Sequence, residues 1–179
     1  SREMIIKKLS GHSGCEILLC ANDSNSQEKY VRKISPDVSY NERLLNQSQK
    51  QEKFTSKLSI IESPKILRRG PVNDLFYFDM NYINGKSLSD HIRSSDISTV
   101  VPLIKALQDY LSCDKIQQTE DLSKFIQEKI KNIRTKTTGY EKFYEHVLQN
   151  NWQHIPTSEC HGDLTFENLI VSNGKLHFI

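Results

Sequence analysis

A short loop near the end of the chain carries side chains that could transfer a phosphoryl group. In the stretch CHGDLTFEN, residues 160–168, His161 and Asp163 are followed by Asn168. Phosphoryl transfer needs a carboxylate that orients the attacking hydroxyl and accepts its proton, and oxygen ligands for Mg²⁺, which prefers octahedral oxygen coordination. Asp163 is the candidate base and Asn168 the candidate metal ligand. We expect His161 to support the loop through hydrogen bonds.

Two alternatives explain the same residues without this chemistry. Asp and Asn are favoured in turns, so a turn-rich loop that enters a hairpin would use them for their backbone preferences. A nucleophile set of Cys160, His161 and Asp163 is a poor alternative, because adjacent residues of one loop seldom orient a thiol, a base and a carboxylate in sequence. The elements that must position the loop therefore decide between these interpretations.

The first 83 residues are mostly β-prone. Turn-rich segments separate short apolar runs, which are MIIKKL (4–9), CEILLC (15–20), KYVRKI (29–34) and, after SPKIL begins a further strand, LFYFDMNYI (75–83). A helix is expected from about Tyr40 to Leu58, where Ser39 and Glu42 have the spacing of a capping box. The pattern predicts five strands with one helix inserted between the third and the fourth.

The second half of the chain is mostly helical. Amphipathic helices are expected over residues 97–112, 121–133 and 141–152. In the first of them the periodicity predicts an apolar face made of Val100, Val101, Ile104, Leu107 and Leu111. The chain then returns to strand, because NLIV and KLHFI flank Asn173-Gly174, a strong signal for a two-residue hairpin turn.

The catalytic-loop sequence also supports a resemblance to a known family. Gly162 stands where protein kinases usually have Arg, and HGDLTFEN resembles the loop of the aminoglycoside phosphotransferase and choline kinase family. The resemblance implies an α+β, bilobal, protein-kinase-like fold that uses ATP and Mg²⁺. It places an antiparallel nucleotide-binding lobe with one helix at residues 1–83. A partial, mainly helical lobe with the catalytic-loop hairpin follows at residues 84–179.

Three upstream features agree with this resemblance. A turn with Gly11, Ser13 and Gly14 separates two strands, where glycine lets backbone N–H groups approach phosphate; any hairpin could also contain it. The resemblance implies that Lys33 contacts the α- and β-phosphates of ATP and pairs with Glu52 on the following helix. An exposed strand lysine and a solvated helix carboxylate are the structural alternatives, and Arg32 must face away from Lys33.

The third feature is the connection between the two halves, FDMNYINGKSL. The resemblance implies that Met80 is the gatekeeper and that the backbone of Asn81 and Ile83 binds the adenine edge. A strand that leads into a tight turn is the alternative. The order of all these features along the chain agrees with the family, which is why we favour a kinase fold.

The resemblance also concerns the end of the sequence. The family follows its hairpin with a Mg²⁺-binding Asp, and the sequence ends at Ile179, about where that Asp would come. We therefore expect a C-terminally truncated chain that is inactive by itself. A catalytically inactive nucleotide-binding pseudokinase or scaffold is the alternative from a different functional class.

The composition and charge of the chain limit the classes of binding partner that we expect. A net charge of +2 and interspersed charges give no reason to expect nucleic acid, and no apolar stretch approaches the length of a membrane span. The four cysteines lack metal-binding spacing and Cys15 and Cys20 would point to opposite faces of a strand, so we expect a reducing, cytoplasmic setting.

The expected acceptor is a hydroxyl of a sugar, amino alcohol or aminoglycoside. A similarity of CHGDLTFEN and RLLNQSQKQEKF to phosphotransferase-like proteins of bacterial surface-polysaccharide clusters favours a sugar. The oligomeric state is not indicated.

Overall fold

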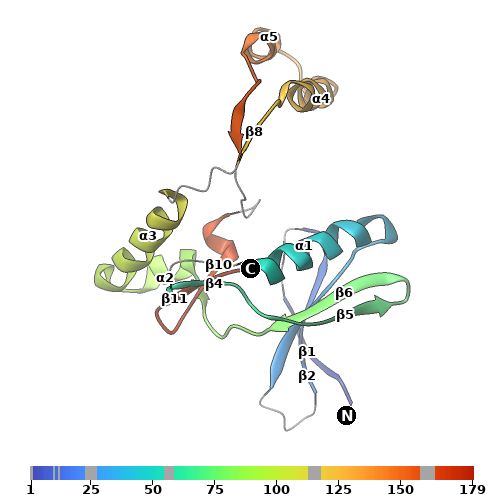
Figure 1. Cartoon of the computed structure of the whole chain (residues 1–179). Coiled ribbons are helices and arrows are strands. Elements are labelled where there is room, and N and C mark those ends of the chain that lie inside the picture. Colours follow the sequence, from blue (N-terminus) through green and yellow to red (C-terminus); the bar gives the residue numbers. More distant parts are fainter. Residues whose placement is uncertain are drawn as a thin grey trace. The chain divides into compact units, whose positions relative to one another are not determined.

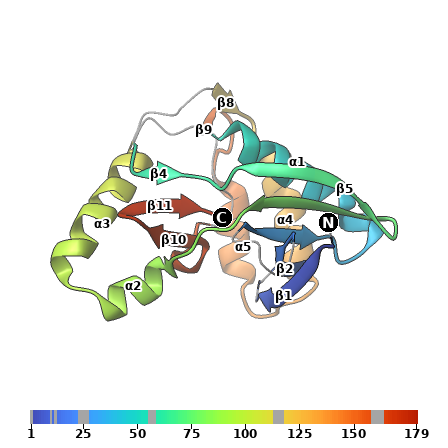
Figure 2. The ribbon, with the colours of Figure 1, turned by 90° about the horizontal axis from the view of Figure 1, so that it is seen from below.

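The computed structural model describes residues 2–9, 11, 13–22, 28–54, 59–112, 118–157 and 164–179 (Figures 1 and 2). The chain forms two compact units, Ser1–Ser112 with Asp163–Ile179, and Cys113–Gly162. Each unit is described by itself below. The predicted lobe boundary between residues 83 and 84 falls inside the first unit and stays a prediction.

A five-stranded antiparallel sheet forms the first part of the larger unit (Figure 1). Its strand order is β1-β2-β3-β6-β5. Helix α1 (Asn41–Lys53) follows β3 in the sequence and precedes β5. The strands are β1 (Met4–Leu9), β2 (Glu16–Ala21), β3 (Lys29–Ile34), β5 (Ile66–Val72) and β6 (Leu75–Asn81). This confirms the predicted α+β class, with an antiparallel N-terminal sheet and one helix inserted after its third strand.

The two faces of this sheet have different cores. Val31 and Phe78 pack with Leu44 of α1 on one face, while Cys20 and Tyr30 pack together on the other. Successive side chains of a strand point to opposite faces, which explains the division. The free thiols Cys15 and Cys20 belong to different clusters. The sequence-based expectation that they lie on opposite faces is therefore confirmed.

The start of α1 differs from the prediction. The Asp37 carboxylate accepts hydrogen bonds from the Tyr40 N–H and the Ser39 hydroxyl, so Asp37 caps the short 3-10 turn η1 (Val38–Tyr40). α1 then begins without a side-chain cap of its own. The predicted capping box of Ser39 and Glu42 is wrong, because the extra turn moves the cap two residues upstream.

A second, four-stranded sheet completes the β structure of the larger unit. It has the order β4-β11-β10-β7, in which β10 (Leu169–Ser172) and β11 (Lys175–Phe178) form the predicted hairpin. Asn173 and Gly174 have φ angles of 51° and 72°, as a type I′ turn requires. The outer strands β4 (Ile61–Glu62) and β7 (Lys86–Ser87) have two residues each and were not predicted, since so short a segment has no periodicity.

Two helices pack with this second sheet. Leu88 of α2 (Leu88–Ser94) and Leu103 and Leu107 of α3 (Ile97–Ser112) join Leu169 and Leu176 of the hairpin in one core. The bounds of α3 agree with the prediction, but its predicted apolar face is wrong in part. The side chains of Val101 and Leu111 are 53% and 62% exposed. The buried stripe is rotated toward Leu103, Ala106 and Leu107.

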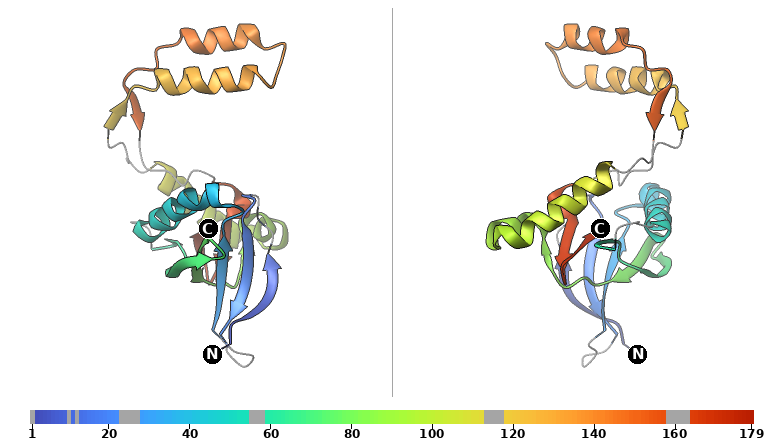
Figure 3. Two further views of the ribbon diagram at one scale, coloured as in Figure 1. Left: turned by 90° about the vertical axis from the view of Figure 1, so that its right-hand side faces the viewer. Right: turned by 60° about the vertical axis from the view of Figure 1, so that its left-hand side comes forward.

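The smaller unit contains a helical pair and a two-stranded sheet. α4 (Ser123–Arg134) and α5 (Glu141–Gln149) lie side by side in Figure 3, and β8 (Gln118–Glu120) pairs with β9 (Ile155–Thr157). Ile130 of α4 and Tyr144 of α5 are the buried residues of the two helices. In the described parts of both units, every helix is too short or too polar to cross a lipid bilayer.

Candidate active site

The described part of the predicted catalytic loop is residues 164–168, which ends in the 3-10 turn η2 (Phe166–Asn168). The Asn168 N–H donates to the Thr165 carbonyl at 3.0 Å, and the Asn168 carbonyl accepts from the Ile179 N–H at 3.1 Å. The backbone of Asn168 is thus held where the β10–β11 hairpin opens. His161 and Asp163 lie outside the described residues, so their positions stay predictions.

A side-chain contact connects this loop to α2, the helix that follows the predicted adenine-binding segment. The Ser89 hydroxyl of α2 donates to the Glu167 carboxylate at 2.9 Å. Glu167 directly precedes Asn168, so the contact ties the turn that carries the candidate metal ligand to α2. Nothing in the spacing of the sequence indicated this pair, because its partners are far apart in the chain.

The predicted adenine-binding segment begins at the end of β6. Met80 is buried beside α1, and the Gln51 amide donates to the Met80 sulfur at 3.4 Å. The Asn81 N–H donates to the Lys65 carbonyl at 3.0 Å. Because this N–H is already used, an adenine contact from Asn81 would have to come from its carbonyl.

The same segment runs directly against the hairpin of the candidate catalytic loop. A Cβ atom at Gly85 would lie 2.1 Å from the Val171 carbonyl oxygen, so only glycine fits this close approach. The Ser172 hydroxyl donates to the Asn84 carbonyl at 2.9 Å. Strands β7 and β10 pair just beyond these contacts. The structure therefore brings together the predicted adenine-binding segment FDMNYINGKSL (78–88), called the hinge below, and the hairpin after Asn168.

A polar cavity of about 540 Å³ opens beside this junction. Of the predicted site residues, Ile83 lines it. The Lys175 ammonium is 2.5 Å from the Glu62 carboxylate and His177 Nδ1 is 3.9 Å from it. The lining consists of Glu62, Tyr82, Ile83, Asn84, Ser172, Asn173, Lys175 and His177.

The charged groups of this cavity influence one another. The hydrogen bond from Lys175 holds the pKa of Glu62 below its usual range. Burial lowers the pKa of His177, and Glu62 opposes that effect only partly. His177, 8% exposed, is thus favoured in its neutral form. Glu62, Lys175 and His177 were not predicted from the sequence, because Glu62 meets the hairpin through the parallel pairing of β4 with β11.

Lys33 lies on the face of the larger sheet that packs with α1. Its cross-strand neighbours are Ile17 on β2 and Phe78 on β6, and Phe78 belongs to the core that contains Leu44. Arg32 faces the other way, as predicted, and binds Asp79. Lys33 therefore shares its face of the sheet with α1, and its predicted contact with the phosphates of ATP stays a prediction.

Glu52, the predicted partner of Lys33, binds a different cation in the structure. Arg69 of β5 donates to its carboxylate at 2.8 Å. Glu52 is 55% exposed at its side chain, which agrees with an ion pair near the surface. An ion pair of Glu52 with Lys33 stays a prediction, and Arg69 is a competitor that the sequence pattern did not identify.

The glycine turn connects β1 and β2. Gly14 has a φ angle of +76°, a backbone conformation that side chains rarely adopt, and a Cβ atom at Gly11 would meet the Ile17 side chain. Ser13 lies between them and is exposed. Glycine is thus structurally required at position 14, and the predicted phosphate contact of all three residues remains a prediction.

The residues of the site fit Mg²⁺ only in part. Among the residues that the structure describes, no group of three or more His, Cys, Asp or Glu side chains is arranged to hold a metal ion. The Asn168 side chain offers an amide oxygen, a ligand type that Mg²⁺ accepts.

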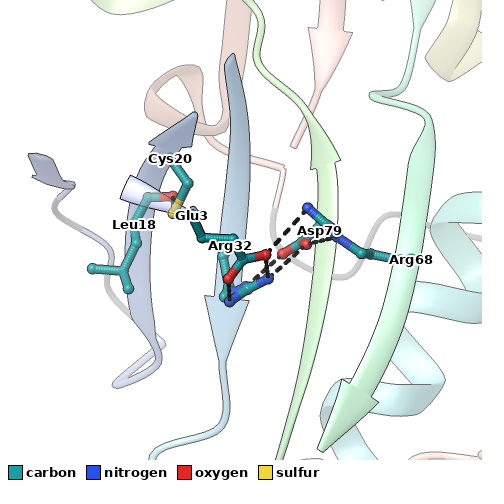
Figure 4. A network of polar contacts seen from close by, with 6 residues as sticks. All are labelled: Glu3, Leu18, Cys20, Arg32, Arg68 and Asp79. Carbon is teal, nitrogen blue, oxygen red and sulfur yellow. Dashed lines mark hydrogen bonds and ion pairs between the residues drawn. The ribbon is translucent and has the colours of Figure 1, made fainter. Parts of the chain in front are cut away.

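A polar network on the opposite face of the sheet was not predicted (Figure 4). Asp79 is fully buried, next to Met80 in the sequence. Its carboxylate accepts hydrogen bonds from Arg32 at 2.8 and 3.0 Å, and it also accepts one from Arg68. Cross-strand pairing of Asp79 with both arginines explains the contacts. The alternation of side chains along β6 predicts that Asp79 lies on the face away from Phe78 and Met80. It does not predict which residues bind Asp79.

Comparisons with known proteins give matches among solved structures. No protein-family model matches the sequence, and no curated protein matches it either. Among solved structures, the chain is similar to the crystal structure of the Mycobacterium tuberculosis PknI kinase domain, C20A mutant, with 10% sequence identity and a TM-score of 0.46. The match covers 98% of this chain and 57% of that one, so the chain spans a little over half the length of that kinase domain.

Proposed function

We propose that the protein is a small-molecule kinase that transfers the γ-phosphate of ATP to a hydroxyl group. One observation carries the proposal: the predicted hinge packs directly against the hairpin that follows Asn168, through the close approach of Gly85 to Val171. An adenine-binding segment and a catalytic loop must be neighbours for phosphoryl transfer, since positioning supplies much of the catalysis.

Five of the candidate residues have a defined role in this proposal. Asp163 accepts the proton of the acceptor hydroxyl and Asn168 provides an oxygen ligand for Mg²⁺. Lys33 neutralises phosphate charge, and the Asn81 carbonyl and Ile83 N–H bind the adenine edge. ATP supplies the phosphoryl group, and Mg²⁺ neutralises charge that develops on its oxygens.

The acceptor is proposed to be a sugar, an amino alcohol or an aminoglycoside-like compound. This rests on the resemblance of HGDLTFEN to small-molecule kinases, in which Gly162 replaces the Arg of protein kinases. We also propose a cytoplasmic location, which the free thiols Cys15 and Cys20 support. No nucleic-acid or membrane partner is proposed.

The experiment that tests the proposal is an acceptor screen with the full-length protein. ATP, Mg²⁺ and single sugars, amino alcohols or aminoglycosides are incubated with the protein, and both ADP and the phosphorylated product are measured. We expect product with one acceptor class and none with a serine-containing peptide. ATP binding without any product would contradict the proposal and favour the pseudokinase alternative, and absence of ATP binding would contradict both.

A further inference from the structure

Lys33 and Arg69 lie on the same cross-strand row of the five-stranded sheet, one on each side of Phe78. Phe78 on β6 is the direct neighbour of Lys33 on β3 and of Arg69 on β5. Directly opposed residues of neighbouring strands share one face of a sheet, so both cations lie on the face that packs with α1. Because adjacent strands are about 4.8 Å apart, the Cα atoms of Lys33 and Arg69 are separated by about 10 Å.

The Arg69 guanidinium binds two residues of α1 that are one turn apart. Nε donates to the Ser48 hydroxyl at 2.8 Å, and Nη2 donates to the Ser48 carbonyl at 3.3 Å and to Glu52 Oε2 at 2.8 Å. Nη1 lies 3.5 Å from Glu52 Oε1, so the guanidinium contacts both carboxylate oxygens. Ser48 is fully buried, and its hydroxyl also donates to the Leu45 carbonyl at 2.8 Å. The contact with Ser48 therefore fixes the guanidinium that holds Glu52.

Polar contacts at both ends hold α1 against the same side of the sheet. The side chain of Asn41, the first residue of α1, donates to the Asp74 carbonyl and accepts from the Phe76 N–H, each at 2.9 Å. Near the other end, the Gln51 amide donates to the Pro64 carbonyl at 2.8 Å. The position of Glu52 above the row of Arg69 and Lys33 is thus determined by the fold.

One helix carboxylate and two sheet cations share this region. The side chains of Glu52 and Arg69 are 55% and 27% exposed, so solvent screens their ion pair only in part. Charges less than about 8 Å apart still attract each other at physiological salt. The flexible four-carbon side chain of Lys33 can carry its ammonium into this range. Without Arg69, Glu52 would therefore attract Lys33 and neutralise part of the charge that Lys33 offers to phosphate.

We propose that Arg69 is a positioning residue of the candidate active site: it holds the Glu52 carboxylate beside β5 and so keeps Glu52 from pairing with the Lys33 ammonium. The inference rests on the proposed function in one respect, that Lys33 contacts phosphate. It assigns Glu52 to Arg69, whereas the resemblance to small-molecule kinases implied a pair of Glu52 with Lys33.

The partner of Glu52 can be tested without ATP, by a double-mutant cycle of Lys33→Met and Glu52→Gln in the full-length protein. Urea unfolding measures the stability of each variant. With Arg69 present, the effects of the two changes should add. In an Arg69→Gln background they should not add, because Glu52 then pairs with Lys33. Non-additive effects with Arg69 present, or additive effects in both backgrounds, would overturn the proposal.

The consequence for the phosphate site is tested by the Kd for ATP. Arg69→Gln keeps a donor for Ser48 but loses the charge, and it should raise the Kd at least about threefold, in the range that one ion pair contributes. Arg69→Lys, which keeps the charge, should stay close to the unchanged protein. Adding Glu52→Gln to Arg69→Gln should restore the affinity, which a merely structural role of Arg69 does not predict.

Two results of the binding experiment would overturn the proposal. One is an unchanged Kd in Arg69→Gln, and the other is a weaker affinity that Glu52→Gln does not reverse. Absence of ATP binding by the unchanged protein would contradict the proposed function instead. The unfolding cycle would then decide by itself whether Arg69 keeps Glu52 from Lys33.

Discussion

Lys33 and Arg32 are neighbours in β3, and their side chains serve opposite faces of the sheet. Arg32 is held by Asp79, while Lys33 shares its face with Phe78 and α1. Replacing Lys33 by Met removes one positive charge from the proposed phosphate site. If the proposed activity is correct, the kcat of the full-length protein should fall roughly 100-fold, in the range observed when one charge-stabilising donor is lost.

Lys29→Met is the matched control, because Lys29 is an exposed lysine on the same strand. Steady-state kinetics should therefore give a lower kcat for Lys33→Met than for Lys29→Met. The kcat of Lys29→Met should stay close to that of the unchanged protein. Equal losses in the two variants would show that the general charge of β3, and not the position of Lys33, affects turnover.

The lowered pKa of His177 should make the stability of the protein depend on pH. Its pKa in the folded state lies below the usual 6.5, chiefly because the ring is buried. As the pH falls through about 6.5, the unfolded chain therefore binds a proton at this position before the folded chain does, and the free energy of unfolding decreases. Above about pH 6.5, His177 makes its full contribution to the free energy of unfolding.

Urea unfolding at about pH 7.5 and about pH 5.5 measures this effect. We expect the free energy of unfolding to drop less between these values in His177→Gln than in the unchanged protein. His154→Gln, which changes an exposed histidine, serves as the control. An equal drop in the unchanged protein and in His177→Gln would refute the account of this residue.

The residues of the candidate site could be predicted only where one segment supplied the whole signal. The Asp163–Asn168 spacing and the hinge around Met80 are local patterns of this kind. Glu62 was not predicted, because its contacts with Lys175 and His177 depend on the pairing of β4 with β11. The contact of Glu52 with Arg69 was missed for the same reason: it joins α1 to β5, and spacing along the chain does not report which elements meet.

At the scale of elements, the hinge and the β10–β11 hairpin can be in contact because Gly85 has no side chain. Gly85→Ala places a Cβ atom 2.1 Å from the Val171 carbonyl oxygen, and backbone on both sides must move to relieve the overlap. We expect a loss of about 1–3 kcal/mol in the free energy of unfolding, the usual cost of overpacking. On the proposed function, the affinity of the full-length protein for ATP should fall as well.

Chemical unfolding measures this change, with Asn84→Ala as the control at the adjacent exposed position. The control should stay within about 0.5 kcal/mol of the unchanged protein, as surface substitutions usually do. A Gly85→Ala variant as stable as the control would mean that the hinge and hairpin are not in the close contact described above.

Helix α3 offers a matched pair of leucines. Leu107 is buried against the second sheet, and Leu111, one turn later, is 62% exposed. Leu107→Ala should cost about 2–5 kcal/mol of unfolding free energy. Leu111→Ala should cost about 0.5 kcal/mol or less. Thermal or urea unfolding of the two variants decides between the observed face and the face that periodicity alone predicted, and equal losses would favour the latter.

Longer elements were predicted well and short ones were not. The strands β1, β2 and β3, the helix α3 and the Asn173-Gly174 hairpin all follow from local periodicity or turn chemistry. β4 and β7 have two residues each, and they form because they pair with the two strands of the β10–β11 hairpin. The cap at Asp37 was missed, because a 3-10 turn before α1 shifts the position of the first helical residue.

At the scale of the whole molecule, the larger unit contains all the described residues of the candidate active site. Residues 2–112 and 164–179 come together through the pairing of β4 with β11 and of β7 with β10. The helical pair α4 and α5 belongs to the other unit. We therefore expect ATP binding to depend on the larger unit, whose sheet and hairpin supply the proposed nucleotide contacts.

The most direct test of the proposed kinase activity is γ-phosphate transfer by the full-length enzyme and its Asp163→Asn variant, with ATP affinity measured in parallel. We expect Asp163→Asn to lower kcat roughly 100- to 10,000-fold, the usual contribution of a general base, while the Kd for ATP changes little. Asn keeps the size of the side chain and removes its ability to accept a proton. Unchanged turnover in Asp163→Asn would contradict the account.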